Sequence, residues 1–175
     1  MLLFDKAELV DAEAVAALIN SAYRGESSRA GWTTEADLLQ GLRTTPQTVA
    51  EIIRRQDAFM LIGVRDDEIV ATLCVELQVL AGRNTAHLGM IAVKPSLQGR
   101  GYGKLLLSAA EAIAYRQWRV AGYHMAVISL RHELIAFYQR RGYQPTGEFR
   151  DFPVDPAMWQ PRVEHMTLQY LAKLR

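Results

Sequence analysis

The feature that most constrains this chain is a group of three glycines within five residues, Gly99, Gly101 and Gly103. They stand between a strand-like apolar run and a run whose apolar residues recur with helical spacing. Glycine lets the backbone turn tightly and approach a ligand, and a helix start offers unpaired N–H groups and the positive end of the helix dipole. The segment therefore predicts an anion site, most simply for a pyrophosphate, with Arg100 and Lys104 adding full charges.

Two common phosphate-binding motifs do not match this segment. A P-loop has four residues between its glycines followed by Lys-Ser or Lys-Thr, and the segment lacks both features. A dinucleotide fingerprint has the spacing Gly-x-Gly-x-x-Gly, whereas these glycines alternate with single residues. The remaining alternative is a glycine-rich connection that holds no ligand.

The other segments predict a mixed sheet with helices on both faces. Apolar and β-branched runs indicate strands, and Asp66-Asp67 separates two of them into a hairpin. The expected strands are one that ends near residue 9 and the ranges 58–65, 68–79, 85–93, 124–130, 143–149 and 163–171. Expected helices follow Asp11, Thr34 and Thr45-Pro46, and two more cover 101–117 and 134–141.

Length and charge limit the classes of protein that fit. The 175 residues suit one domain, 1–175. Twenty basic against nineteen acidic residues give a net charge of +1, which argues against a nucleic-acid partner. The chain has neither a signal-peptide pattern nor an apolar run of the roughly 18 residues that a membrane span needs, so we expect a cytoplasmic protein without a membrane partner. His, Cys and carboxylate residues show no metal-ligand spacing, and we expect no metal.

Two motifs resemble the GNAT superfamily of N-acetyltransferases. Gln98-x-x-Gly101-x-Gly103 resembles its acetyl-CoA signature, and Tyr138-x-x-x-Gly142-Tyr143 resembles the Tyr-x-x-x-Gly-aromatic pattern that ends a later helix. The resemblance covers about residues 58 to 149. It implies the acyl-CoA N-acyltransferase fold, a twisted and mostly antiparallel sheet of about seven strands, and acetyl-CoA as the co-substrate.

The resemblance also implies residue roles. Tyr138 matches a tyrosine that protonates the departing thiolate, although a core aromatic is the alternative. The pantetheine arm would bond main-chain groups of Ile91, Ala92 and Val93. The pyrophosphate would be held by Gln98, Gly99, Arg100, Gly101, Tyr102, Gly103 and Lys104. Relatives often carry an asparagine seven residues before the tyrosine, where this chain has Arg131, so the contacts of that side chain are in doubt.

Direct attack on a thioester requires a neutral amine, and a base is therefore useful. His87 takes the place where histone-acetylating relatives carry a glutamate, and an unperturbed histidine pKa of about 6.5 suits proton removal near neutrality. Glu76 on the preceding strand is the competing candidate and would act through a water chain. A structural strand histidine is the alternative for His87. Cys74 lies in an apolar run away from both motifs, so we expect direct transfer in a ternary complex.

The acceptor substrate is the part of the function that the sequence constrains least. In the superfamily the amine enters over the first helices and their loop, which here offers Glu26 for a cation, Arg24 for a carboxylate and Trp32 as an apolar wall. A polar loop that covers the sheet edge is the alternative. The primary amine of a small molecule is the favoured acceptor. A lysine or N-terminus of a protein is an alternative, and relatives that acetylate ribosomal proteins carry a glutamate on the strand where this chain has Ala126. A non-catalytic CoA-binding sensor is a further alternative, and a homodimer is plausible because relatives often pair.

Overall fold

The computed structural model describes residues 1–175. Its strands are β1 Leu3–Lys6, β2 Leu39–Gly41, β3 Ala58–Arg65, β4 Glu68–Leu80, β5 Arg83–Val93, β6 Gly122–Ile128, β7 Gln144–Asp151, β8 Trp159–Pro161 and β9 Thr167–Leu174. Its α-helices are α1 Ala12–Tyr23, α2 Pro46–Arg54, α3 Tyr102–Trp118 and α4 His132–Gln139. Three short 3-10 helices are η1 Leu9–Asp11, η2 Glu26–Ala30 and η3 Pro95–Leu97.

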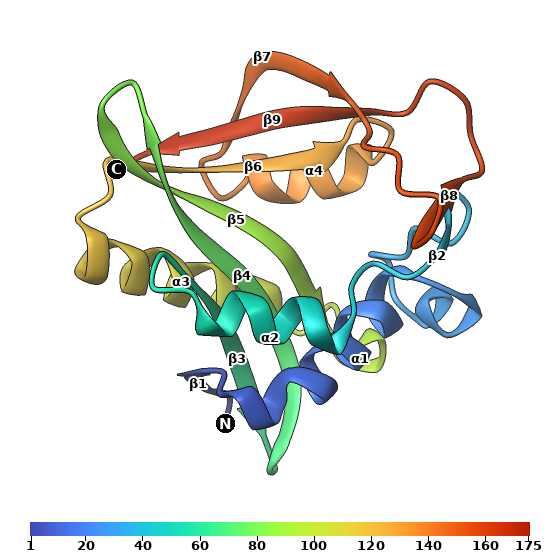
Figure 1. The fold of residues 1–175 in the computed structure, drawn as a ribbon, viewed down its shortest axis with the longest axis horizontal. Coiled ribbons are helices and arrows are strands. Elements are labelled where there is room, and N and C mark those ends of the chain that lie inside the picture. The colour runs from blue at the N-terminus through green and yellow to red at the C-terminus, as the bar shows by residue number, and fades with distance from the viewer.

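Seven strands form one twisted sheet in the order β1-β3-β4-β5-β6-β9-β7 (Figure 1). Every neighbouring pair is antiparallel except β5 with β6. The expected sheet of about seven mostly antiparallel strands is therefore confirmed. The predicted hairpin of β3 and β4 is also present, and its turn places Asp66 and Asp67 at φ 52° and 59°, the left-handed conformation that tight hairpin turns require.

The prediction of a helix after Thr34 is wrong. The Thr34 hydroxyl accepts a bond from the Ala36 N–H at 3.2 Å, which closes a local turn. Leu39 then begins the short strand β2, which pairs with β8, a strand that the sequence did not predict. Leu39 packs under Ile128 and Met166, whereas Leu42 is 47% exposed, so the leucines do not share one helical face.

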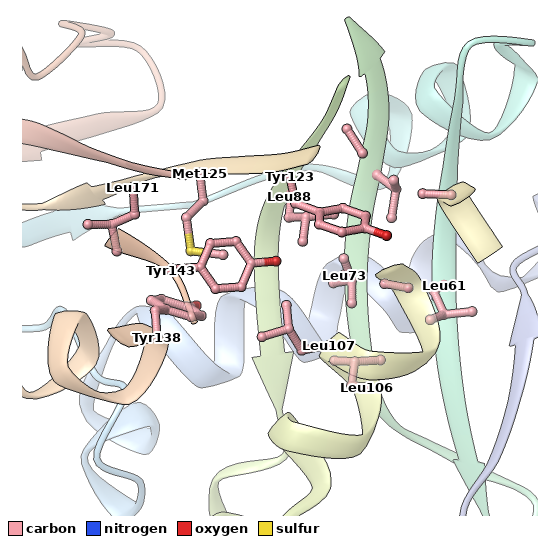
Figure 2. Close-up of a cluster of buried hydrophobic side chains, with 14 of the residues drawn as sticks. Leu61, Leu73, Leu88, Leu106, Leu107, Tyr123, Met125, Tyr138, Tyr143 and Leu171 are labelled. Carbon is pink, nitrogen blue, oxygen red and sulfur yellow. The ribbon is translucent and has the colours of Figure 1, made fainter. Parts of the chain in front are cut away.

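Helices cover both faces of the sheet. On one face, α3 and α4 pack over β3, β4, β5 and β6 in the larger apolar cluster, part of which is drawn in Figure 2. On the other face, α1 and α2 pack over Met60, Ile62 and Cys74. Burial of these side chains is the main favourable contribution to folding. No helix of the protein combines the length and the apolar character that crossing a membrane would require.

The strands β5 and β6 separate soon after they meet. They pair only at Ala86 with Tyr123 and at His87 with His124, and from there they diverge (Figure 1). Beside this opening, two residues of β5 lie opposite one of β4 between the pairs Cys74–Gly89 and Thr72–Ala92. Met90 within this bulge has φ 49°. Bulges of this kind redirect a strand and are frequent beside active sites.

Candidate active site

Two cavities open where β5 and β6 diverge. The first, here called the loop cavity, has a volume of about 370 Å³ and lies between the glycine-rich segment and α4. The second, the strand cavity, has about 310 Å³ and lies between the diverging parts of β5 and β6. Ile91, Leu134 and Tyr138 line both cavities. The two cavities therefore adjoin at these three residues.

The loop cavity has the properties of an anion site. Gly99 and Gly101 have φ 79° and 82°, and no atom lies within 4 Å of the Cβ that another residue would carry there. Gly101 is the N-cap residue of the 17-residue helix α3, so the free N–H groups of that helix begin at the cavity. Lys104 and Arg140 line the same space. The backbone, the dipole and the charges together suit a phosphate-bearing ligand.

The predicted loop residues do not all face the cavity. Gly99, Gly101, Tyr102, Gly103 and Lys104 line it, as do Ile91 and Val93. The side chain of Arg100 is exposed and is not part of the lining. Ala92 points to the opposite face of the sheet, into the cluster under α1. Arg140 and Arg141, to which the sequence analysis gave no role, line the cavity from the end of α4.

Gln98 joins two segments that are distant in the sequence. Its amide oxygen accepts the N–H of Trp32 at 2.8 Å, and its amide nitrogen donates to the Thr33 hydroxyl at 2.8 Å and to the Val93 carbonyl at 3.0 Å. Its side chain thus connects the loop after η2 to the glycine-rich segment. The signature glutamine lines the loop cavity while its side-chain polar atoms are used within the protein.

Tyr138 stands at the junction of the two cavities. The residue is 4% exposed, and its ring packs against Phe137 and Tyr143. Burial, followed by the nearby Tyr23, raises the pKa of the Tyr138 hydroxyl far above its usual range. The hydroxyl therefore keeps its proton at any physiological pH. A buried, protonated donor at the meeting point of two ligand cavities is placed as a general acid would be.

His87 lines the strand cavity, and Glu76 lies opposite it on β4. Burial lowers the pKa of the His87 imidazole, and Arg43 lowers it further, while Glu76 acts in the opposite direction. Glu76 itself is outside the lining and binds Arg55. The ring of His124 is 5.0 Å from that of His87 between centroids, and its pKa is lowered to about 4 by burial and by His87.

The expected acceptor residues are dispersed. Arg24 lines the strand cavity and is 5% exposed. Trp32 lines the loop cavity instead and packs against Phe137 with 5.6 Å between ring centroids. Glu26 is exposed, lines neither cavity and pairs with Arg29, three residues away.

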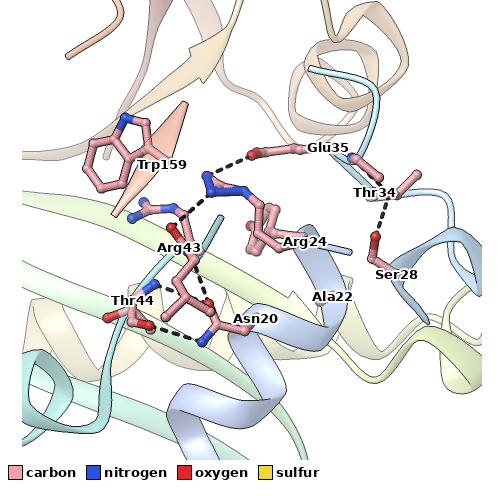
Figure 3. Close-up of polar contacts among 12 residues, drawn as sticks. Asn20, Ala22, Arg24, Ser28, Thr34, Glu35, Arg43, Thr44 and Trp159 are labelled. Atoms are coloured by element: carbon pink, nitrogen blue, oxygen red, sulfur yellow. Dashed lines mark hydrogen bonds and ion pairs between the residues drawn. The ribbon is translucent and has the colours of Figure 1, made fainter. Parts of the chain in front are cut away.

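A buried charge cluster forms one wall of the strand cavity (Figure 3). Glu35 binds Arg24 at 3.4 Å and Arg131 at 3.1 Å. Arg131 also donates to the Thr33 carbonyl at 2.6 Å. Arg131, which replaces the asparagine of many relatives, thus holds the segment after η2 against α4. Arg43 completes the charged lining.

Aromatic residues from the end of the chain also line the strand cavity, and the sequence analysis did not anticipate them. Phe152 and Trp159 line the cavity and pack edge to face with 6.2 Å between centroids. Tyr170 of β9 joins them. These residues belong to a proline-bearing stretch and a strand with no motif of their own. Only the folded chain brings them to the same cavity as Arg43.

Comparison with known proteins agrees with this geometry. The family model of the "Acetyltransferase (GNAT) family" matches residues 15–143. No curated protein matches the chain. The structure resembles the ribosomal-protein-S18-alanine N-acetyltransferase of Escherichia coli, with 16% identity, TM-score 0.69, and 99% of this chain and 94% of that chain covered.

Two further solved structures share the fold. A GNAT-family acetyltransferase of Streptococcus pneumoniae has 14% identity and TM-score 0.68, with 100% of both chains covered. The spermidine/spermine N-acetyltransferase SpeG of Vibrio cholerae has 12% identity and TM-score 0.68, with 99% of this chain and 95% of that chain covered. At these identities the structures establish the fold, and the family model covers most of the chain. The protein belongs to the GNAT family of acetyltransferases.

Proposed function

We propose that this acetyltransferase moves the acetyl group of acetyl-CoA to the primary amine of a small molecule, by direct attack in a ternary complex. The observation that carries the proposal is the junction of the two cavities at Ile91, Leu134 and Tyr138. A thioester that ends at this junction and an amine in the strand cavity would meet there. The volume of the strand cavity, about 310 Å³, suits a small acceptor.

The residues of the loop cavity fit acetyl-CoA, the co-substrate of the family. Gly99 and Gly101 leave open space where a side chain would otherwise stand, at the N-terminus of α3. Lys104, Arg140 and Arg141 would add positive charge for the phosphates, and Ile91 and Val93 would face the pantetheine arm. Bound acetyl-CoA supplies an activated acetyl group, whose thioester carbon is open to attack by an amine.

Two residues that line the strand cavity, His87 and Tyr138, would transfer the protons of the reaction. The reaction forms an N–C bond, breaks the S–C bond, and moves one proton from the nitrogen to the sulfur. His87, whose depressed pKa keeps it neutral at pH 7, would accept the proton of the attacking amine. Tyr138 would donate its hydroxyl proton to the leaving sulfur and regain one from solvent. His87 would release the proton that it accepted to solvent, so that the proton lost by the amine equals the one gained by the thiol.

Direct transfer is supported by the position of the single cysteine. Cys74 is buried in the cluster under α1, and burial raises the pKa of its thiol to about 12. It lines neither cavity, and neither cavity is lined by another cysteine or by a serine. An acetyl-enzyme would require a nucleophile at the junction.

Initial-rate kinetics test the proposed mechanism. We expect thiol release from acetyl-CoA that depends on an added small primary amine, with intersecting double-reciprocal lines as both substrates are varied. Parallel lines together with an acetylated protein in mass spectrometry would refute direct transfer. Acetylation of a peptide when every small amine fails would favour a protein acceptor, and binding of acetyl-CoA without any transfer would favour a sensor.

The pH dependence of kcat tests His87. Because the pKa of the His87 imidazole lies below the usual 6.5, the imidazole is already neutral at pH 7, and its titration should not make kcat depend on pH there. The kcat should fall by about tenfold per pH unit once the imidazole becomes protonated below that pKa. His87→Gln should lower kcat and remove this acid limb. His165→Asn changes an exposed histidine outside both cavities and should keep the limb. An unchanged profile in His87→Gln would exclude His87 as the base.

A further inference from the structure

Arg43 is the only charged side chain of the strand cavity whose charged group has no partner in the protein. Arg24 and Arg131 both bind Glu35, whereas the Arg43 guanidinium makes no hydrogen bond or ion pair. In Figure 3 it extends toward Trp159, on the far side of Arg24 from Glu35. The positive charge of Arg43 acts on two neighbouring groups: after burial, it contributes to lowering the pKa of both His87 and Arg24.

The position of Arg43 is fixed by the fold. The amide oxygen of Asn20, on α1, accepts the backbone N–H of Arg43 at 2.8 Å and that of Thr44 at 3.2 Å. The Asn20 amide nitrogen donates to the Thr44 carbonyl at 3.0 Å. These three bonds hold the backbone between β2 and α2 against α1. The backbone that carries Arg43 is therefore already ordered before a ligand binds, and the partly buried side chain lines the cavity.

The charges of the cavity do not balance. Three arginines and one glutamate line it, so two positive charges have no counter-ion within the lining. The buried Nε of Arg24 also has no hydrogen-bond partner. Buried charges and donors are normally paired, and an unpaired one in a ligand cavity is a place for a ligand group. A cationic acceptor such as a polyamine would be repelled by this wall, whereas an anionic group would be attracted.

The rest of the cavity is apolar. Phe152, Leu168, Trp159 and Tyr170 line the same space. The indole N–H of Trp159 donates to the Pro153 carbonyl at 3.0 Å, so the ring offers the cavity an apolar surface without an unpaired donor. A ligand that fills the cavity therefore needs a negative group for Arg43, an apolar part for the aromatic wall and an amine for the junction.

We propose that the acceptor is a small amine that also carries a carboxylate and an apolar side chain, as an amino acid does, and that Arg43 binds this carboxylate. The inference rests on the proposed function and specifies its substrate class. Guanidinium and carboxylate match in a bidentate geometry that lysine cannot reproduce. Arg43 thereby acts as a specificity-determining residue that turns the amine toward Tyr138 and His87.

Matched acceptors test this inference. Acetyl-CoA-dependent thiol release is measured with L-phenylalanine, L-phenylalaninamide, 2-phenylethylamine and spermidine, and with a series of other L-amino acids and their amides. The amide keeps the shape of the amino acid and replaces its charged carboxylate with a neutral group. We expect kcat/KM for the amino acids to exceed that for their amides by about tenfold to a hundredfold, as hydrogen bonds to charged groups give.

Variants locate the effect at Arg43. Arg43→Gln should remove the preference for the amino acid by raising its KM, with KM for the amide changed by less than about twofold. Arg43→Lys should restore only part of the preference. Arg54→Gln removes one positive charge from an exposed position of α2 outside the cavity and should keep the preference. As a readout of binding alone, 3-phenylpropanoate, which lacks the amine, should compete with the amino acid in the wild type and not in Arg43→Gln.

The outcomes separate the inference from the function on which it rests. Acetylation of amides or spermidine in preference to amino acids would overturn the inference and leave small-molecule acetylation standing. A preference that survives in Arg43→Gln would also overturn it. Failure of every small amine, with acetyl-CoA still bound, would overturn both the inference and the proposed function.

Discussion

Replacing Gly101 with glutamate should lower the affinity for acetyl-CoA by about a hundredfold or more. The glutamate side chain would occupy open space at the N-terminus of α3 and place a negative charge where we expect the pyrophosphate. The measurement is isothermal titration of the folded variant with acetyl-CoA. Adding Gly103→Glu should strengthen the loss, because a Cβ at Gly103 lies 3.4 Å from the Phe137 ring and turns toward the same cavity.

Gly82→Glu is a matched control for Gly101→Glu. Gly82 has φ 74°, close to the 82° of Gly101, and it too has no atom within 4 Å of an added Cβ. Glutamate therefore meets similar backbone strain at both positions, on the order of 1–2 kcal/mol, and adds the same charge. Gly82 lies in the hairpin turn between β4 and β5, outside both cavities. Equal loss of affinity in the two variants would contradict a pyrophosphate site in the loop.

The parts of the site that a contiguous motif encodes could be predicted from the sequence. The glycine-rich segment and the helix that carries Tyr138 are local patterns, because backbone conformation and helix starts depend on neighbouring residues. The seven strands of the main sheet followed from the same local rules, and only their boundaries moved by a few residues. The small sheet of β2 and β8 was missed. The segment after Thr34, where a helix was expected, has leucines at helical spacing that pack in different environments. Local periodicity cannot reveal that difference.

The residues of the acceptor side could be identified only in the folded chain. Glu26 and Glu76 were reasonable candidates by residue type, yet each is bound by an arginine outside the cavities, Arg29 and Arg55 respectively. Arg43 precedes a helix start and resembles any solvated arginine in the sequence. Its significance depends on Glu35 being bound to other arginines and on aromatic residues more than 100 positions later. Charge balance in a cavity depends on segments that only the fold brings together, so it cannot be predicted from the spacing of residues in the sequence.

Tyr138→Phe should lower kcat by about a hundredfold while changing the affinity for acetyl-CoA little. The ring and its packing against Phe137 and Tyr143 remain, and only the hydroxyl at the junction of the cavities is lost. Since burial raises the pKa of this hydroxyl far above neutral pH, the hydroxyl stays protonated and the loss should be the same across about pH 6 to 9. Steady-state kinetics over that range, with titration of acetyl-CoA, provide the measurement.

Tyr123→Phe separates this role from the general cost of removing a buried hydroxyl. Tyr123 is also 4% exposed, and its hydroxyl donates to the Glu111 carbonyl at 2.9 Å, outside both cavities. Its removal should cost about 1 kcal/mol of stability with little effect on kcat. A Tyr138→Phe enzyme that turns over as fast as Tyr123→Phe would show that the leaving sulfur needs no proton from Tyr138. Tyr138 would then contribute only to packing of the core, and solvent would protonate the thiolate.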